Sequence, residues 1–136
     1  MATQIIDTTI NGSSFPATYI GAGTLIGNVR RSSDVVNDIY GYFTAAGNAV
    51  QINLGYRPLE IEVLDLTGVI QWSWLYGMPA TNSLKGVAAG TLTVDTTSAI
   101  VVSEPNPAAN NSGNYIVTLS AALCVSTHLI LFYING

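Results

Sequence analysis

Apolar and polar residues alternate most regularly between residues 48 and 78. Within this stretch, apolar residues stand at every second position of three segments, 50–54, 59–63 and 70–76. A period of two is typical of β-strands that have one face in the core and the other in water. Turn-forming residues separate the segments, which predicts short links and an antiparallel meander. The alternation slips at residues 63–66, which we interpret as the end of a strand.

Five further segments have the composition of strands, so that eight or nine strands are predicted and no helix of three turns. These segments are 39–44, 91–95, 99–103, 114–120 and 127–134. The last one is apolar at both parities, so we expect it to lie centrally in a sheet or to have its second face covered by another element or subunit. Residues 77–90 and 104–113 are rich in small and polar residues and predict surface loops. The pattern predicts an all-β fold, an antiparallel β-sandwich or jelly roll.

The first 37 residues have no sustained hydrophobic period. Large apolar residues are scattered through a stretch that is rich in Gly, Ser and Thr, and residues 28–37 have the composition of a loop. We therefore predict two regions, an extended N-terminal arm and loop at 1–37 and a β-sandwich domain at 38–136. A free tail is usually poorer in apolar residues, so we expect the arm to lie over a neighbouring subunit, with a disordered leader as the alternative. The expected contact residues of the arm are Ile5, Ile6, Ile10, Phe15 and Tyr19.

The composition indicates one domain with an unusually uncharged surface. The chain has 136 residues, of which 9% are charged, against a usual ~25%. A small domain normally depends on surface charge for solubility, so this composition favours a protein that packs against copies of itself or against a larger assembly. The alternative is a stable monomer with a polar but uncharged surface.

Charge and hydropathy argue against several classes of partner. The net charge is −4 and only four residues are Lys or Arg, so a role in binding nucleic acid is not expected. The longest apolar run, 129–134, is far shorter than a membrane helix, and no signal sequence is expected at the N-terminus. The single cysteine, Cys124, excludes an internal disulfide framework and is compatible with assembly in a reducing cytoplasm.

Candidate catalytic chemistry is sparse in this sequence. His128, the only histidine, stands at the start of an apolar strand, where a satisfied strand-end residue is the expected role. Glu60 and Glu62 are two positions apart on one strand, ~7 Å from each other, but carboxylates on the solvent face of any amphipathic strand have that spacing. No group of residues has the spacing of a metal site or of a phosphate-binding loop. We predict no enzyme activity and no cofactor.

Three aromatic residues, Trp72, Trp74 and Tyr76, share one face of the segment 70–76. Because they have the same parity as Ile70, packing in the core is the expected role. The alternative is that they face a ligand, as a stacking platform for sugars or as a protein-binding patch.

Three stretches resemble the small head decoration, or cement, proteins and related virion structural proteins of tailed bacteriophages. They are residues 53–58 (Asn-Leu-Gly-Tyr-Arg-Pro), 61–67 (Ile-Glu-Val-Leu-Asp-Leu-Thr) and 72–78 (Trp-Ser-Trp-Leu-Tyr-Gly-Met). The resemblance covers the central third of the chain and consists mainly of turn residues. It implies a β-rich domain, often a homotrimer, that is made in the host cytoplasm and binds the major capsid protein on the virion surface. It transfers no catalytic residue.

We therefore expect a structural virion protein that decorates and stabilises a capsid by bridging neighbouring capsid subunits. The first alternative is a phage tail-fibre or receptor-binding domain, in which the loops at 77–90 and 104–113, or the Trp72 and Trp74 side chains, contact a host glycan. Another alternative is a small sugar-binding module that is unconnected with phage.

Overall fold

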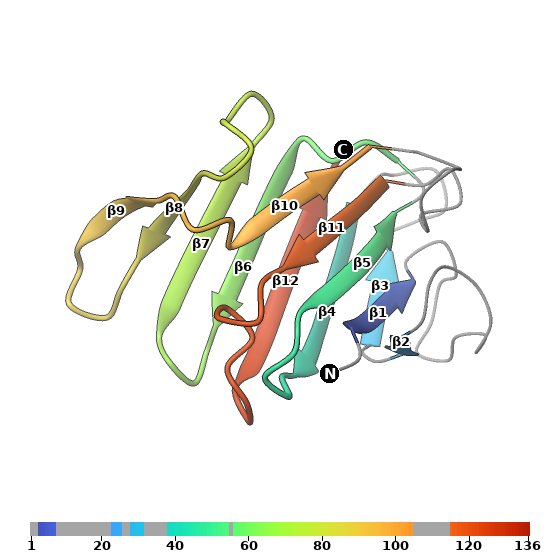
Figure 1. Ribbon diagram of the computed structural model, residues 1–136, viewed down its shortest axis with the longest axis horizontal. Helices are drawn as coiled ribbons and strands as arrows, with labels where there is room; N and C mark the ends of the chain where they lie inside the picture. The colour runs from blue at the N-terminus through green and yellow to red at the C-terminus, as the bar shows by residue number, and fades with distance from the viewer. Residues whose placement is uncertain (1–2, 8–22, 26–27, 32–37, 55, 105–114) are drawn as a thin grey trace.

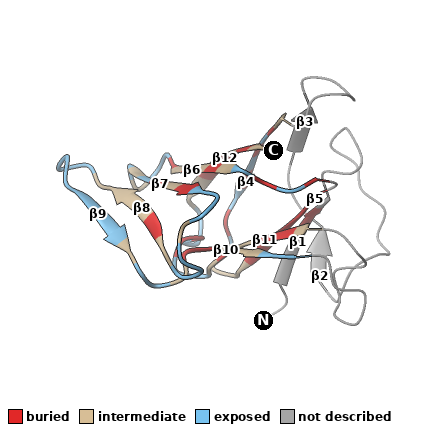
Figure 2. Cartoon of the chain, turned by 90° about the horizontal axis from the view of Figure 1, so that it is seen from above, coloured by how far each residue is buried: buried red, intermediate tan, exposed pale blue. Residues whose placement is uncertain are grey.

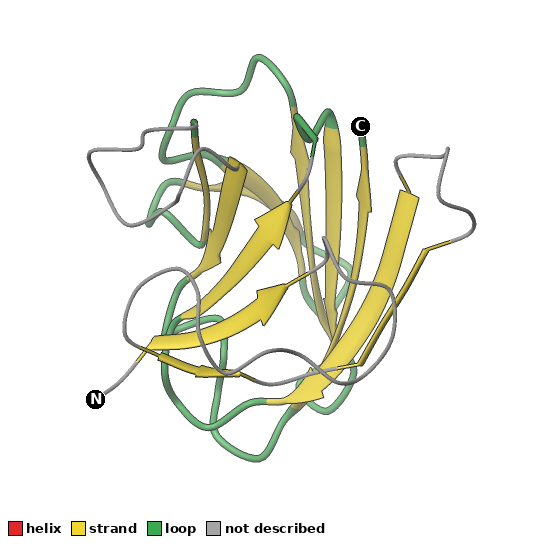
Figure 3. Ribbon diagram, turned by 90° about the vertical axis from the view of Figure 1, so that its right-hand side faces the viewer, coloured by secondary structure: helices red, strands yellow, loops and turns green. Residues whose placement is uncertain are grey.

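Strands form all the regular structure in the part of the chain that the structure describes (Figure 3). The computed structural model describes residues 3–7, 23–25, 28–31, 38–54, 56–104 and 115–136, and before residue 38 it describes the side chain of Ile6 alone. The strands are β1 (Thr3–Asp7), β2 (Gly23–Leu25), β3 (Asn28–Arg31), β4 (Asp38–Thr44), β5 (Val50–Leu54), β6 (Glu60–Asp65), β7 (Ile70–Leu75), β8 (Ser83–Gly86), β9 (Leu92–Asp95), β10 (Ile100–Ser103), β11 (Tyr115–Leu119) and β12 (Leu129–Asn135).

Two sheets pack face to face and form a β-sandwich (Figure 1). Sheet A has the strand order β10-β11-β5-β1-β2, and sheet B has the order β3-β4-β12-β6-β7-β8-β9. The view from above separates the two layers and shows buried residues in strands of both sheets (Figure 2). The predicted all-β sandwich is confirmed.

The eight strands predicted from the sequence are all present, and in β5 and β6 the apolar parity faces the core. On β5, Val50, Ile52 and Leu54 are fully buried. On β6, Ile61 and Val63 are likewise buried, and the slip in alternation coincides with the end of this strand at Asp65. Alternating burial follows from the pleat, because successive side chains point to opposite faces of a strand.

The prediction of one continuous meander over the central stretch is wrong. β5 belongs to sheet A and β6 to sheet B, so the chain crosses between the layers after residue 54. Tyr56 lies at this crossing with a buried ring, and its hydroxyl donates a hydrogen bond of 2.8 Å to the backbone oxygen of Ile134. A Cβ atom on Gly136 would lie 2.2 Å from the Tyr56 ring, so this glycine permits the close approach.

The last strand, β12, lies in the middle of sheet B, between β4 and β6, which is the first of the two arrangements expected from the sequence. Its inward residues Ile130, Phe132 and Ile134 are buried in the core. Its outward residues, which include Leu131 and Tyr133, are half-buried on the side of sheet B that faces away from sheet A. We call this side the outer face of sheet B.

The N-terminal region is not simply an arm laid over a neighbour. β1 lies between β5 and β2 in sheet A and pairs in parallel with both, so sheet A is mixed rather than antiparallel. Ile6 is fully buried in the core of its own chain. β3 pairs with β4 in sheet B, where the sequence predicted a loop. The prediction failed because hydrophobic alternation was too short to reveal strands of three to five residues.

The predicted surface loop at 77–90 also contains a strand. β8 pairs with β7 on one side and with β9 on the other. Its sequence, Ser-Leu-Lys-Gly, has little strand propensity, and its pairing is imposed by the flanking strands. The other predicted loop, 104–113, lies outside the described residues except for Glu104.

Candidate functional site

Two rows of side chains cross the outer face of sheet B, because cross-strand partners point to the same side of a sheet. The pairing registers align one row as Tyr40, Tyr133, Glu62, Ser73, Leu84 and Val94. They align the next row as Tyr42, Leu131, Leu64, Gln71, Gly86 and Leu92. Most of these side chains are apolar or aromatic, and Glu62 is the only charged one. In the described part of the chain, no element covers this face (Figure 2).

A hollow of about 560 Å³ lies over β4, β12, β6 and β7 on this face. Its lining includes Tyr40, Tyr42, Tyr133, Glu62 and Gln71. Tyr40 and Tyr42 are 54% and 50% exposed, which is high for aromatic rings on a sheet. The volume lies within the usual ~300–1,000 Å³ of small-molecule sites. We call this hollow the tyrosine groove.

The ring of Tyr133 is held in place from two directions. Its centroid lies 4.7 Å from that of Tyr40, with the two ring planes inclined at 32°. Its hydroxyl donates to Oδ1 of Asp38 at 3.3 Å and accepts a hydrogen bond of 2.9 Å from Nδ2 of Asn135. Burial raises the pKa of Tyr133, and the carboxylate of Asp38 raises it further, so the phenol remains protonated near neutral pH.

The carboxylate of Glu62 is oriented by two neighbours on β7. It accepts a hydrogen bond of 2.8 Å from Nε2 of Gln71. The hydroxyl of Ser73 donates to it as well and lies 3.1 Å from each carboxylate oxygen. Ser73 lies directly opposite Glu62, and Gln71 is the diagonal neighbour. The second carboxylate that the sequence singled out, Glu60, stands two positions before Glu62 on β6 and pairs in register with Asn135 and Leu75. Glu60 does not line the tyrosine groove.

The edge of sheet B at β9 exposes apolar side chains. Leu92 and Val94 are 66% and 58% exposed, and in the described chain no strand pairs with the free side of β9. β8 and β9 extend past β10, the last strand of sheet A, so no second layer lies against them (Figure 1).

The two tryptophans are core residues. Trp72 and Trp74 are 4% and 7% exposed, which agrees with the expected packing role and contradicts the ligand-facing alternative for these two rings. Nε1 of Trp72 donates to Oδ2 of Asp95 at 3.3 Å. Lys85 lies 5.7 Å from the Trp72 ring centroid. Alternation on a strand shows which residues share a face but not which face is buried. On β7, the face that carries Trp72 and Trp74 is the one that points toward sheet A.

Tyr76, the third aromatic residue of that set, lies just beyond the end of β7 and is exposed. Its ring and that of Tyr115 lie 5.3 and 5.9 Å from the guanidinium carbon of Arg57. Arg57 also approaches Glu104 at 3.5 Å. These residues line a second hollow of about 360 Å³, whose polar groups are largely occupied by one another.

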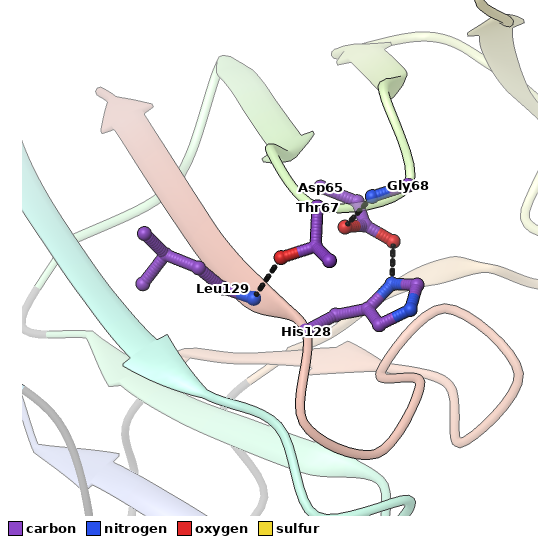
Figure 4. A network of polar contacts seen from close by, with 5 residues as sticks. All are labelled: Asp65, Thr67, Gly68, His128 and Leu129. Atoms are coloured by element: carbon purple, nitrogen blue, oxygen red, sulfur yellow. Dashed lines mark hydrogen bonds and ion pairs between the residues drawn. The ribbon is translucent and has the colours of Figure 1, made fainter.

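The single histidine belongs to a polar cluster at one end of sheet B (Figure 4). Nδ1 of His128 lies 2.7 Å from Oδ2 of the fully buried Asp65, whose other oxygen accepts a hydrogen bond of 2.8 Å from the backbone N–H of Gly68. The hydroxyl of Thr67 accepts a hydrogen bond of 3.0 Å from the backbone N–H of Leu129. The cluster joins the β6–β7 turn to the start of β12.

The Asp65–His128 pair has the arrangement of the acid and the base of a catalytic triad. Among the described residues, no serine, threonine or cysteine that could serve as the nucleophile hydrogen-bonds to His128. Cys124 is fully buried, and burial raises its pKa to about 12, so it remains an unreactive thiol. A structural role for His128 at the strand end accounts for its contacts.

Of the five expected contact residues in the N-terminal region, Ile6 is assigned to the protein's own core. Ile5 lies on β1, with a side chain that the structure does not describe. Ile10, Phe15 and Tyr19 lie outside the described residues. The described residues include no group of three or more His, Cys, Asp or Glu side chains that could hold a metal ion. They also form no helix with the length and hydropathy needed to cross a membrane.

Sequence reasoning missed the tyrosine groove. Tyr40 and Tyr42 alternate with Ile39, Gly41 and Phe43, so aromatic residues occupy both parities of this strand. That pattern indicates a strand with two apolar faces, one packed in the core and the other able to bind a ligand or another protein chain. Comparison with known proteins found no family model, curated protein or solved structure that matches this chain.

Proposed function

We propose that the protein is a structural virion component that decorates a bacteriophage capsid and bridges neighbouring capsid subunits. The proposal rests on the resemblance of residues 53–78 to phage decoration proteins, on a chain with only 9% charged residues, and on the exposed apolar edge of sheet B. In this role the protein acts as a β-sandwich whose surface is covered by other protein chains, without catalysis.

The observation that carries the proposal is the composition of β9. Soluble monomers usually protect the edges of their sheets with Lys, Pro, a bulge or a covering element. The strand here reads Leu-Thr-Val-Asp, and Leu92 and Val94 are both largely exposed. Full burial of a large aliphatic side chain stabilises an interface by about 1.5–3 kcal/mol. An edge of this kind favours a protein that is covered after it folds.

The proposed partners are the major capsid protein and further copies of this chain, in a homo-oligomer such as a trimer. Ile6 cannot serve as a docking residue, since it is already buried in its own core. We therefore assign contacts to the β8–β9 edge in place of Ile6. Ile5, Ile10, Phe15 and Tyr19 stay expected contact residues, since the structure does not describe their side chains. This assignment differs from the sequence-based expectation in its location but not in its physical basis, which is the burial of exposed apolar surface.

The test is the location of the protein in particles grown from a genome that carries this chain. Mass spectrometry of purified particles should find the protein at a fixed ratio to the major capsid protein, and cryo-electron microscopy should place it on the head. A double variant, Leu92→Lys with Val94→Lys, should lower its occupancy on the head. The matched control is Val125→Lys, which changes an exposed apolar residue outside β9. Absence from the particles, or a location only on the tail, would overturn the proposal.

The second candidate function is a tail-fibre or receptor-binding domain that binds carbohydrate. The Trp72 and Trp74 side chains do not support it, because both are buried. The tyrosine groove does favour it, since exposed aromatic rings lie there beside oriented polar groups.

A further inference from the structure

The tyrosine groove combines two kinds of surface that a purely apolar interface does not need. Its lining includes Tyr40, Tyr42 and Tyr133 on β4 and β12, and Glu62 and Gln71 on β6 and β7. The strands that carry these groups are adjacent, so the row from Tyr40 through Tyr133 and Glu62 to Ser73 spans ~14 Å at the usual spacing between strands. That length accommodates a short chain of sugar rings.

The aromatic part of the lining is organised before any ligand arrives. Tyr133 is stacked against Tyr40 and has its hydroxyl fixed by Asp38 and Asn135. A tyrosine has only two side-chain torsions, and fixing them in advance lowers the entropy cost of binding. The rings present electron-rich faces, which attract the weakly positive C–H groups on the flat side of a pyranose ring.

The polar part of the lining is also organised in advance. Gln71 and Ser73 hold the Glu62 carboxylate, which has lone pairs beyond those that these two contacts use. The amide oxygen of Gln71 is an acceptor as well. A carboxylate beside an amide can accept hydrogen bonds from neighbouring hydroxyl groups of one sugar, and such bonds to a charged acceptor are the stronger kind.

We propose that the tyrosine groove is a binding site for a neutral oligosaccharide of pyranose units. A sugar of this class has the C–H faces that the rings can stack on and the hydroxyl groups that Glu62 and Gln71 can bind. Glu62 is a carboxylate, so a neutral sugar meets the polar part of the lining without the repulsion that an acidic group beside Glu62 would meet. A second copy of this chain is a poorer occupant, because its matching face would place one Glu62 carboxylate in an apolar contact.

This site is separate from the edge at β9, and the proposal does not rest on a role in the virion. Leu92 and Val94 lie at the last strand of sheet B, whereas the groove lies over β4, β12, β6 and β7. A protein that binds sugar through the groove could be part of a virion or of any other assembly.

The test is affinity electrophoresis of the full chain in gels that contain neutral soluble polysaccharides: hydroxyethylcellulose, galactomannan, xylan or glycogen. At least one should retard the protein, and its tetrasaccharide should then be titrated by calorimetry. Tyr40→Ala should weaken binding roughly tenfold or more, since it removes a central aromatic contact. Tyr40→Phe keeps the ring and should retain most of the affinity. Glu62→Gln should weaken binding by losing the charged acceptor.

Tyr76→Ala is the matched control, because Tyr76 is an exposed tyrosine outside the groove, and it should bind as the parent does. Thermal melting of each variant separates a loss of binding from a loss of folding. Retardation that Tyr40→Ala leaves unchanged would overturn the proposal, as would a failure of every polysaccharide and of an array of neutral glycans to bind. A change in sedimentation of Tyr40→Ala and Tyr42→Ala, without any sugar binding, would identify the groove as a protein interface instead.

Discussion

At the residue scale, Asp65 shows how a buried carboxylate is tolerated in a core that is otherwise apolar. It is fully buried, and its two oxygens are bound separately, by the His128 ring and by the backbone N–H of Gly68. An unpaired buried carboxylate would be very unfavourable, so these partners are required rather than incidental. The cluster depends on close approach, since a Cβ atom on Gly68 would lie 2.8 Å from Oδ2 of Asp65 and 3.3 Å from Cε1 of His128.

We expect Gly68→Ala to lower the free energy of unfolding by about 1–3 kcal/mol, because the added methyl must displace Asp65 or His128. Urea denaturation measures the change. The control is Gly86→Ala, where the nearest atom to the new Cβ is Cδ1 of Leu92 at 3.9 Å. If the two variants are equally stable, the Asp65 cluster is not tightly packed.

Asp95 links pH to stability through its contacts with the core. Burial acts to raise its pKa, but hydrogen bonds from Thr97 and Trp72 and the charge of Lys85 outweigh burial, so its pKa lies below the ordinary value of 3.8. A lowered pKa in the folded state means that the charged carboxylate contributes stability above the unfolded pKa. That contribution is lost as pH falls through the folded pKa.

We therefore expect Asp95→Asn to lower the free energy of unfolding at pH values well above 3.8. The difference in this free energy between the variant and the parent should narrow as the pH falls below 3.8. Denaturant titrations at several pH values, followed by tryptophan fluorescence, measure the difference. A constant gap at all pH values would show that the charge of Asp95 is not involved.

At the element scale, β1 changes the interpretation of the N-terminal region. It lies inside sheet A, with β5 on one side and β2 on the other, and it delivers Ile6 to the core. A strand with two neighbours satisfies its backbone groups on both sides, so its loss would leave β5 with an open edge.

Ile6→Ala should lower the free energy of unfolding by about 2–5 kcal/mol, the usual cost of truncating a buried isoleucine. Val94→Ala, at an exposed position, should change it by less than about 0.5 kcal/mol. Removal of residues 1–7 should destabilise the protein at least as much as Ile6→Ala. If the truncated chain melts at the temperature of the parent, β1 is an accessory arm, as the sequence first indicated.

At the scale of the whole molecule, the two sheets differ in width. Sheet B has seven strands and sheet A has five, so β8 and β9 extend past the second layer (Figure 2). This overhang explains why every side chain of β9 except Asp95 is exposed. The molecule thus carries an aromatic groove over one part of sheet B and an apolar edge at its end.

We expect the protein to self-associate through that edge at micromolar concentration, and we expect Leu92→Lys with Val94→Lys to shift it toward monomer. Added charge on an edge strand opposes pairing with another strand. Sedimentation velocity measures the shift, with Val125→Lys as the control. Unchanged sedimentation in the double variant would exclude β9 from the oligomer interface.

The strands that could be predicted have alternation over five or more residues, as in β5 and β6, or are apolar segments bounded by turn residues, as in β10. The short strands β2, β3 and β8 could not be predicted, because their pairing is decided by neighbours that are distant in sequence. Trp72 and Trp74 were correctly expected in the core, whereas Tyr40 and Tyr42 were not recognised as a candidate site. A single strand does not reveal which tyrosines another strand will place beside it.

The sequence by itself determined the all-β class and the inward parity of β5 and β6, because these follow from the local period of apolar residues. For β12 it left two possibilities open, a central place in a sheet or a second face covered by another element or subunit. Only the tertiary structure decided that β5 and β6 lie in different sheets, that β1 pairs in parallel within sheet A, and that Tyr40, Tyr133 and Glu62 form one row. Register between strands depends on contacts between residues far apart in the chain, such as Tyr40 with Tyr133, and no local pattern specifies them.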